Sequence, residues 1–367
     1  MRSKCFYGCY NLRDFTIEES DKIITIESSI FSTDVIEPYM TNLTILCAGF
    51  TGSNRFPYAV RITANVIDFN IYTGKTTELH FGPRVSSVNA QKMNSYDGMS
   101  ISVDENNVTY SSVDGVLFNK NKTELVRFSK DVLQRNYEIP SSVTSIGDYA
   151  FSYCYAIESI SIPSSVTSIG ANAFYECSKL TSVSIPSGVT VINENTFQDC
   201  SSLAQISLPN TLKEIHSHAF DGCSALESIN IPSSVTSISD YAFRKCSSLA
   251  SEIEIPRGVR YLDQYIFEGC SSLPSIKILG TYVQEISDMC FSGCVSLKSI
   301  YCNTPEAPIT SSHTFGNRES TYTGRNTYNT SENILYVPAN STGYDSSYWL
   351  SPLCDSTYCG FTLSQTL

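Results

Sequence analysis

One stretch of sixteen residues returns along this chain and restricts its fold more than any other feature. IPSSVTSIGDYAFSYC, from Ile139 to Cys154, returns as IPSSVTSIGANAFYEC from Ile162 and as IPSSVTSISDYAFRKC from Ile231. A phenylalanine and the cysteine three places after it recur together at steps of 23 or 24 residues. The pairs are Phe151/Cys154, Phe174/Cys177, Phe197/Cys200, Phe220/Cys223, Phe243/Cys246, Phe267/Cys270 and Phe291/Cys294. Such a fixed period is the signature of a stacked repeat architecture.

Each repeat predicts one coil of three parts. The apolar pattern L-x-x-I-x-I-P-x-x-V-x-x-I begins with an alternation that is typical of a strand buried on one face. The proline ends this strand because it has no N–H group to donate, and a second short extended piece such as VTSI follows. The next position is rich in residues that cap helices, and it leads into YAFxxC, for which we expect a single helical turn. These capping positions are Gly147, Gly170, Asn193, His216, Ser239, Asp263 and Ser287.

A single coil of this kind cannot bury its own apolar side, so the coils are expected to stack. Neighbouring strands then lie about 4.8 Å apart, and equivalent Phe, Cys, Leu and Ile side chains form continuous ladders. The predicted fold class is an α/β repeat solenoid that is mostly β, with a parallel strand ladder and single-turn helices. Its coils are about 23 residues long.

The motif IPSSVTSIGxxAFxxCxxLxxI, which covers Ile139 to Cys302, resembles the BspA-like branch of leucine-rich repeats, also called the Treponema pallidum type. A second feature of that family is a repeat interrupted by a segment like DENNVTYSSVDGVLFNKNKTELVRF, here Asp104 to Phe128. We interpret it as a strand pair, Val116–Phe118 and Thr123–Phe128, joined by a turn at Asn119–Lys122. The ending LYVPANSTGYDSSYW, from residue 335 to 349, also resembles the usual C-terminal cap of the family.

These features predict four parts of the chain. Residues 1–100 hold degenerate leucine-rich repeats with irregular excursions, because only isolated L-x-x-I-x-I echoes remain there. The segment from Phe69 to Phe81 is too short for a coil and is expected to form a hairpin that turns at Gly74. Residues 101–138 are the interrupted repeat with its β-hairpin, 139–302 are regular repeats, and 303–367 are the cap. Because CFYGCYNL near the N-terminus echoes CFSGCVSL at 290–297, we expect the chain to begin inside the repeat array, either as a trimmed chain or as the C-terminal part of a longer secreted protein.

The charge of the chain argues against some classes of partner. Charged residues make up 16% of the sequence, the formal net charge is −12, and no Lys/Arg cluster stands out. Binding to nucleic acid needs a cationic surface, and attachment to anionic lipid needs one as well. We therefore predict no nucleic-acid partner, and no membrane insertion within this chain because no apolar run is long enough.

The cysteines and histidines predict no metal or cofactor. The seven ladder cysteines point the same way, whereas a disulfide needs facing Cβ vectors, so buried free thiols are the better interpretation. Cys354 and Cys359 remain a pair that could form a disulfide. The i, i+4 pair of Cys5 and Cys9, like the pair of Cys290 and Cys294, lacks further Cys or His ligands. The two histidines of HSH at 216–218 offer too few ligands for a metal and are interpreted as surface variation.

The same sequence predicts no enzyme. It contains no G-x-S-x-G elbow, P-loop or H-E-x-x-H motif. Glu252 and Glu254 lie two residues apart on one strand face, whereas glycoside hydrolysis needs carboxylates that oppose each other across a cleft.

The outward strand positions are expected to form a concave recognition ribbon. The first coils offer mainly serines there, such as Ser182 and Ser184, and serine rarely anchors a partner. The later coils, from residue 252 to 301, are more distinctive. The candidate ligand-binding residues are Gln205, Asn230, Glu252, Glu254, Lys277 and Tyr301.

The family resemblance implies a cell-surface or secreted protein, and some members are implicated in attachment to host matrix proteins such as fibronectin and fibrinogen. We therefore predict a non-catalytic, extracellular protein-interaction or adhesion module whose partner is an extracellular or host matrix protein. Two alternatives remain open: a carbohydrate-binding surface accessory and a structural spacer of a larger surface protein. The neutral Ser/Asn ribbon and the Tyr-rich tail with Trp349, the single tryptophan, motivate the glycan alternative. Against that alternative, Tyr344 and Trp349 of the tail are interpreted as residues that seal the open end of the solenoid.

Overall fold

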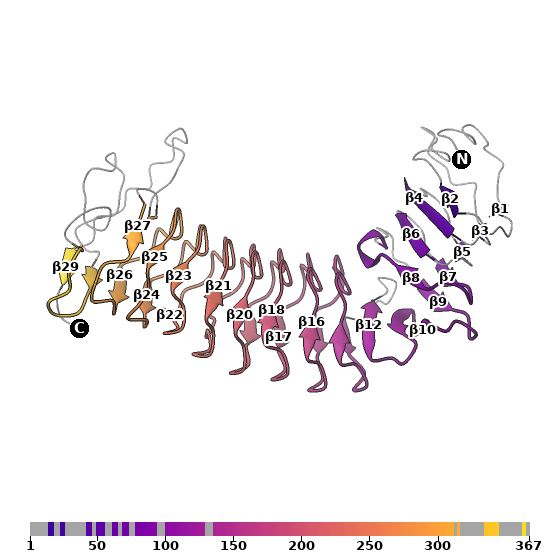
Figure 1. Ribbon diagram of the computed structural model, residues 1–367, viewed down its shortest axis with the longest axis horizontal. Coiled ribbons are helices and arrows are strands. Elements are labelled where there is room, and N and C mark those ends of the chain that lie inside the picture. The colour runs from indigo at the N-terminus through magenta and orange to yellow at the C-terminus, as the bar shows by residue number, and fades with distance from the viewer. Residues whose placement is uncertain are drawn as a thin grey trace. The chain divides into compact units, whose positions relative to one another are not determined.

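In the computed structural model the regular elements of the described residues are short strands, most of them paired in parallel, and one 3-10 helix, and the contacts divide the chain into two units (Figure 1). The structure describes residues 14–17, 23–25, 42–45, 49–55, 61–64, 68–72, 78–93, 100–128, 135–311, 314–315, 334–344 and 362–364. Unit 1 comprises Met1–Arg135 and Ser142–Ala156, and unit 2 comprises Asn136–Ser141 and Ile157–Leu367.

Two parallel sheets form the first part of unit 1. One sheet has the order β1-β3-β5-β7-β9, with strands Asp14–Ile17, Asn42–Ile45, Arg61–Ala64, Glu78–Phe81 and Ser100–Val103. The other has the order β2-β4-β6-β8, with strands Ile23–Thr25, Gly49–Arg55, Asp68–Tyr72 and Ser87–Val88. A 3-10 helix, η1 (Ala90–Lys92), follows β8. The first four coils each give one strand to each sheet, and the next coil gives β9 to the first sheet only.

The hairpin predicted from Phe69 to Phe81 is wrong. β6 pairs in parallel with β4 and β8, whereas β7 pairs in parallel with β5 and β9, so the two strands belong to different sheets. The ten-residue spacing therefore separates the second strand of one coil from the first strand of the next, and not two strands of a hairpin. The error arose because β5, Arg61-Ile-Thr-Ala64, lacks the apolar alternation of its neighbours and gave no signal.

The hairpin predicted in the interrupted repeat is confirmed. β11 (Val116–Asn119) pairs antiparallel with β12 (Glu124–Arg127), and β12 then pairs in parallel with β14 (Ser145–Ile146). The structure adds a third strand, β10 (Tyr110–Val113), which is antiparallel to β11. Asp114 and Gly115 make the two-residue turn between them with φ of 49° and 81°, and Asp-Gly suits such a turn because both residues tolerate positive φ.

A buried asparagine ties the inserted strands to the preceding coil. The side-chain amide of Asn107 donates to the carbonyl oxygens of Gly82 at 2.8 Å and Val85 at 2.9 Å. Its oxygen accepts from the backbone N–H groups of Thr109 and Tyr110, each at 2.8 Å. All four of its hydrogen-bonding positions are thus used, as burial of an amide requires.

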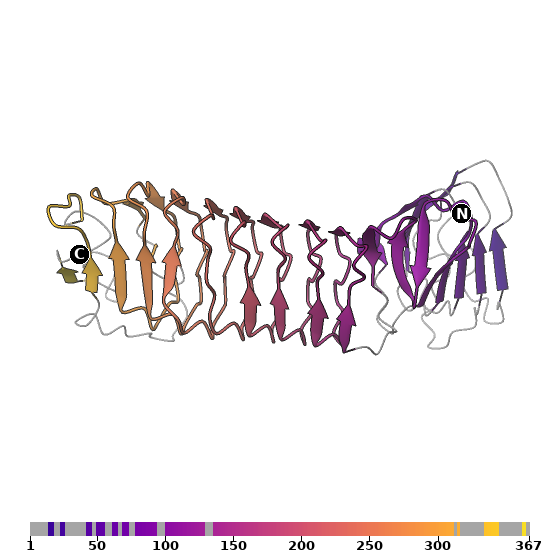
Figure 2. The same cartoon turned by 90° about the horizontal axis from the view of Figure 1, so that it is seen from below.

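Unit 2 contains the regular coils, whose first strands lie side by side and point the same way (Figure 2). One sheet has the order β13-β15-β17-β19, with strands Asn136–Glu138, Ser159–Ser161, Ser182–Ser184 and Gln205–Ser207. A second has the order β22-β24-β26-β28-β29, with strands Ile253–Ile255, Ser275–Ile278, Ser299–Cys302, Ile334–Tyr336 and Thr362–Ser364. The second strands of the coils are β16 (Ser168–Ile169), β18 (Val191–Ile192), β20 (Glu214–Ile215), β21 (Ser237–Ile238), β23 (Tyr261–Leu262), β25 (Glu285–Ile286) and β27 (Ile309–Thr310). The predicted mostly-β parallel solenoid is confirmed.

The prediction of single-turn helices is wrong. In the described coils YAFxxC forms consecutive turns instead. In one coil, Ala173 N–H donates to Gly170 at 3.3 Å and Cys177 N–H donates to Phe174 at 3.1 Å. Asn172 and Glu176 have φ of 57° and 54°, and left-handed residues cannot continue a right-handed helix. Their N–H groups point instead to the carbonyl oxygens of Glu194 and Gln198 in the next coil. The turns therefore bind coil to coil.

Stacked phenylalanines and buried thiols run through the core of unit 2. Ring centroids of successive phenylalanines are 5.2–5.7 Å apart, and the ring planes are nearly parallel; the ladder is Phe174, Phe197, Phe220, Phe243, Phe267, Phe291 and Phe315. The N–H of Phe197 donates to Ala219 of the next coil at 2.9 Å. Its carbonyl oxygen accepts from the Sγ of Cys223 in that coil at 3.1 Å. The thiols of Cys200, Cys246, Cys270 and Cys294 donate in the same way, so these buried thiols are hydrogen-bond donors as well as apolar fillers.

The nine described cysteines are free and buried, as the ladder predicted. Burial raises the pKa of the Cys200 and Cys223 thiols, since a thiolate is poorly solvated there. The other five cysteines, Cys5, Cys9, Cys47, Cys354 and Cys359, lie outside the described residues.

Replacing one ladder ring tests this core. Phe197 is fully buried between Phe174 and Phe220, so Phe197→Ala is expected to lower the free energy of unfolding by about 3–5 kcal/mol. Urea unfolding followed by circular dichroism measures the change, with Phe197→Leu as a milder companion. A midpoint unchanged by the alanine variant would contradict the ladder.

The raised thiol pKa values give a second prediction. An ordinary exposed cysteine has a pKa of about 8.5 and is mostly thiolate at pH 9. Cys200 and Cys223 are expected to stay protonated and unmodified by iodoacetamide at pH 9, and to react only after denaturant opens the coils. Peptide mass spectrometry reads each site. Rapid native labelling of either cysteine would show that it is not enclosed.

Candidate functional site

The outward residues of the first strands in unit 2 form a surface that we call the strand face. Its first part is a row of serines. A shallow groove of about 390 Å³ runs over β15, β17 and β19 and is lined by Ser159, Ser182, Ser184, Ser207 and Gln205, with Ile160, Val183 and Ile206 beneath. Gln205 is exposed and lies beside Ser182 in the strand register. Small hydroxyls give this part of the face little to anchor a partner.

The strand face is interrupted after Gln205. Residues 228–230 were predicted as the next strand, but they form none, and the sheet resumes only at β22. The coil that follows has an extra residue before its strand, in LASEIEI against LESINI, so two neighbouring coils differ in length at this point. Asn230 is exposed within the irregular segment. The structure therefore brings neither Gln205 nor Asn230 to the remaining four candidate residues.

Those four residues do come together: Glu254, Lys277 and Tyr301 lie on three neighbouring strands, and Glu252 directly precedes β22. The register aligns Glu254 with Lys277 and Lys277 with Tyr301. The Nζ of Lys277 lies 2.6 Å from Oε1 of Glu252 and 3.7 Å from Oε1 of Glu254. It also lies 5.8 Å from the centre of the Tyr301 ring, within the range of a cation–π contact. The later coils of the predicted ribbon thus hold these four residues in a single network of contacts.

A fifth residue, Tyr336 of β28, completes this network. Its ring stacks on Tyr301 with centroids 4.5 Å apart and planes 6° apart, and the register pairs the two residues. We call Glu252, Glu254, Lys277, Tyr301 and Tyr336 the strand-face cluster. The sequence carried a signal for Tyr336, since ILYVP repeats the I-x-I-P end of a coil. Residues 303–333 break the period before it, so Tyr336 was counted with the tail.

Of the two carboxylates in the cluster, only Glu252 is tightly paired, so that of Glu254 can still bind a partner. Hydrogen bonding to Glu252 raises the pKa of Lys277, and the Coulomb attraction of Glu252 and Glu254 adds to the effect. Glu252 also accepts from Ser275 Oγ at 3.0 Å. The side chain of Glu254 is 55% exposed and only loosely paired. Two carboxylates and one ammonium give the cluster a net charge of −1, which favours a basic group on a partner.

Behind the strand face, Tyr344 is buried as predicted for a residue that seals the solenoid. Its hydroxyl donates to the carbonyl oxygen of Thr304 at 2.9 Å and lies 3.2 Å from the sulfur of Cys302. Trp349 and the other tail tyrosines except Tyr336 lie outside the described residues.

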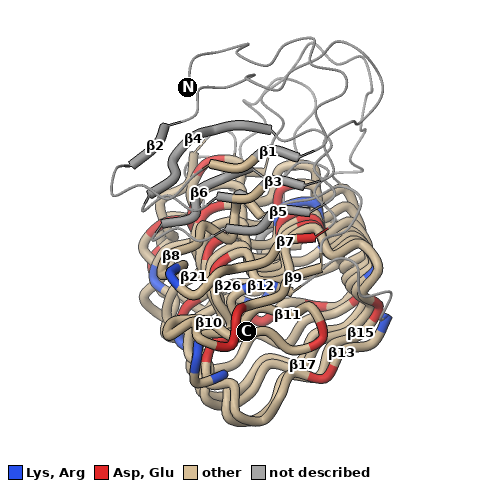
Figure 3. Tube along the Cα trace, turned by 90° about the vertical axis from the view of Figure 1, so that its right-hand side faces the viewer, with Lys and Arg blue, Asp and Glu red and all other residues tan. Residues whose placement is uncertain are grey.

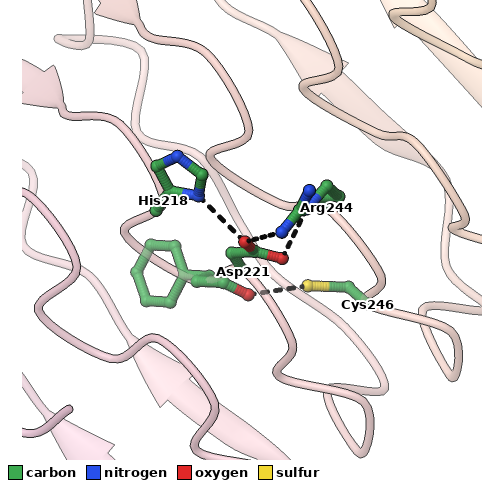
Figure 4. Close-up of polar contacts among 5 residues, drawn as sticks. His218, Asp221, Arg244 and Cys246 are labelled. Atoms are coloured by element: carbon green, nitrogen blue, oxygen red, sulfur yellow. Dashed lines mark hydrogen bonds and ion pairs between the residues drawn. The ribbon is translucent and has the colours of Figure 1, made fainter.

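A second polar cluster lies on the turns of two adjacent coils (Figure 4). Asp221, with a side chain 3% exposed, accepts from Arg244 Nε at 2.9 Å and Nη2 at 2.7 Å. His218 Nδ1 lies 2.9 Å from the same carboxylate. The His218 ring stacks on Tyr241 at 4.5 Å, and hydrogen bonding to Asp221 raises the pKa of Arg244. Every charged group here has a partner inside the protein, so the cluster ties the coils together.

These contacts refine the interpretation of HSH as surface variation. His216 Nε2 lies 2.9 Å from an exposed carboxylate oxygen of Glu214, as a surface residue would. His218 instead occupies a left-handed position with φ of 57° and joins the stacked turn residues. Among the described residues, no group of three or more His, Cys, Asp or Glu is arranged to hold a metal ion.

In the backbone view of Figure 3, the described Lys and Arg positions appear as separate short segments. Within the described part of the chain, no helix has the length and apolar character needed to cross a membrane.

Several solved structures of leucine-rich repeat proteins are similar to parts of this chain. Among solved structures, a leucine-rich repeat protein of Treponema pallidum shares 24% identity over 55% of this chain and 83% of its own, with a TM-score of 0.40. One from Bacteroides ovatus shares 30% identity over 64% of each chain, with a TM-score of 0.47. A leucine rich cell surface protein of Faecalibacterium prausnitzii shares 23% identity over 76% of this chain and 62% of its own, with a TM-score of 0.43.

Among proteins with curated functions, none matches the chain significantly. The family model described as "BspA type Leucine rich repeat region" matches in six copies, over residues 1–45, 124–250 and 247–336. These ranges cover more than half of the sequence. The chain therefore belongs to the BspA-type leucine-rich repeat family.

Proposed function

We propose that this protein is a non-catalytic, secreted or cell-surface adhesion module that binds an extracellular protein through the strand-face cluster. The observation that carries the proposal is the stack of Tyr301 on Tyr336 beside Lys277 and two glutamates, on strands of a continuous sheet. The class of partner is a host matrix protein, for which the family resemblance is the support.

The chemistry of the cluster favours a protein partner. Tyrosine supplies large contact area at low entropic cost, and it is enriched among the residues that dominate binding energies. The pair of stacked rings limits the motion of both side chains, so less freedom is lost on binding. The exposed carboxylate of Glu254 can pair with a basic side chain of the partner. The serine part of the face would then contribute complementarity and little energy.

The same geometry favours a binding role over catalysis. Glu252 and Glu254 lie on one strand, and Lys277 pairs with both, so neither faces a second carboxylate across a cleft. Stacked parallel strands hold the cluster on a rigid scaffold, which suits recognition. A surface location follows from the family resemblance, and it is part of the proposal.

Truncating the central tyrosine tests the proposal. Fibronectin and fibrinogen are immobilised separately, and binding of the intact chain is measured by biolayer interferometry. Saturable binding is expected, and Tyr301→Ala is expected to weaken it about 30-fold, the loss typical of a hot-spot residue of about 2 kcal/mol.

Ser184→Ala on the serine part of the same face is the matched control and is expected to bind as the unmodified chain does. Thermal unfolding of each variant shows that the fold is retained. Absence of binding to both matrix proteins, or equal binding by the Tyr301 variant, would contradict the proposal. In the first case the structural-spacer alternative would stand ahead.

A further inference from the structure

Unit 1 contains a cavity at the point where its ladder of second strands is interrupted. β8 is the last strand of the sheet β2-β4-β6-β8, and the following strand of that kind, β12, pairs with β11 and β14 instead. A cavity of about 530 Å³ lies between β8 with η1 on one side and β12 with the turn after β14 on the other. Its polar lining residues are Ser87, Asn89, Gln91, Glu124, Asp148 and Tyr149.

Two features of the chain keep this space open. The inserted strand β11 occupies the edge of β12 that would otherwise continue the ladder. Gly147 lines the cavity without a side chain, and a Cβ there would lie 3.3 Å from Oε1 of Glu124. Several later coils place a larger residue at the equivalent position, including Asn193 and His216. The cavity is therefore a consequence of the insertion and of one glycine.

We propose that this cavity binds a neutral sugar residue of a glycan. Its volume lies within the range of about 300–1,000 Å³ that is typical of small-molecule sites. The lining combines carboxylates, which only accept hydrogen bonds, with amides and hydroxyls, which both donate and accept. Sugar hydroxyls match such a mixture because each can donate to a carboxylate and accept from an amide. Val88, Ala90 and the Tyr149 ring supply apolar surface for the carbon side of a pyranose.

Two of the polar side chains have hydrogen-bonding capacity to spare. Asn89 occupies the N-cap position of η1 but makes no side-chain cap hydrogen bond. The half-buried carboxylate of Glu124 has no ion-pair or hydrogen-bond partner among the described residues. Burial of such groups is costly unless a ligand or water satisfies them. A polyhydroxylated ligand would supply the missing donors.

The lining disfavours other classes of ligand. No Lys or Arg is among the lining residues that the structure describes, while Glu124 and Asp148 both carry negative charge, so phosphate or sulfate groups would be repelled. The described residues also contain no group of three carboxylate, thiol or imidazole ligands for a metal ion. The site is separate from the strand-face cluster and does not depend on it.

The experiment is isothermal titration calorimetry of the intact chain with cellotriose, maltotriose, mannotriose and chitotriose. Glucose 6-phosphate and spermidine serve as an anionic and a cationic comparison. Saturable binding of at least one of the four neutral sugars is expected, with Glu124→Ala at least tenfold weaker. Glu105→Ala, an exposed carboxylate of the same unit, is the matched control and is expected to leave the affinity unchanged.

Gly147→Gln fills the cavity from the other side and is expected to abolish sugar binding, which keeps the test valid if the Glu124 variant fails to fold. Tyr301→Ala is expected to leave sugar affinity unchanged, so the outcome is distinguishable from a failure of the adhesion proposal. The inference is overturned if none of the four sugars binds. It is also overturned if only spermidine or glucose 6-phosphate binds, or if both cavity variants retain full affinity.

Discussion

The bonding between one ladder phenylalanine and the next coil is the interaction on which the regular part of this protein depends. The ring stacks on its equivalents, the N–H donates to the following coil, and the carbonyl oxygen accepts a buried thiol from it, as Phe197 shows. A coil that is held at three points cannot shift its register without breaking all three. Strand positions are therefore fixed from coil to coil, and outward residues such as Lys277 and Tyr301 keep their alignment. The cysteine in the repeat is explained by this arrangement, because alanine or valine could fill the space without donating a hydrogen bond.

The sequence predicted the fold where the period was strict and lost it where length or composition changed. The Phe and Cys ladders follow directly from the period of 23 or 24 residues, because equivalent residues of a stacked repeat must lie over one another. The turns were mistaken for helical turns, although a signal existed: Gly222, Gly269 and Gly293 mark one left-handed position, and Asn172 and Asn195 mark the other. In the degenerate region, β5 contains Arg61 and Thr63 in place of large apolar residues, so its place in the sheet is set by its neighbours.

The candidate site, too, could be predicted from the sequence only in part. Glu252, Glu254, Lys277 and Tyr301 could be grouped from the sequence because alternation along a strand and one period between strands place them on one surface. Asn230 lies outward, between the buried Ile229 and Ile231, but no strand forms there, and the apolar alternation alone does not show this interruption of the sheet. Tyr336 required the structure, since the segment before β28 hides the period. The cavity beside Glu124 also required it, because an absent strand pairing leaves no mark in the sequence.

In the proposed function the repeated residues supply the shape of the protein, and the departures from the repeat supply binding. The most direct test converts the strand-face cluster to the serines of the early coils, with Glu252→Ser, Glu254→Ser, Lys277→Ser and Tyr301→Ser in one chain. Thermal unfolding and interferometry against the matrix protein that the unmodified chain binds are then measured on the same sample. We expect a midpoint within a few degrees of the original, because these side chains lie outside the buried core, together with loss of saturable binding. Full binding by this variant would contradict this expectation, and so would a collapse of the fold.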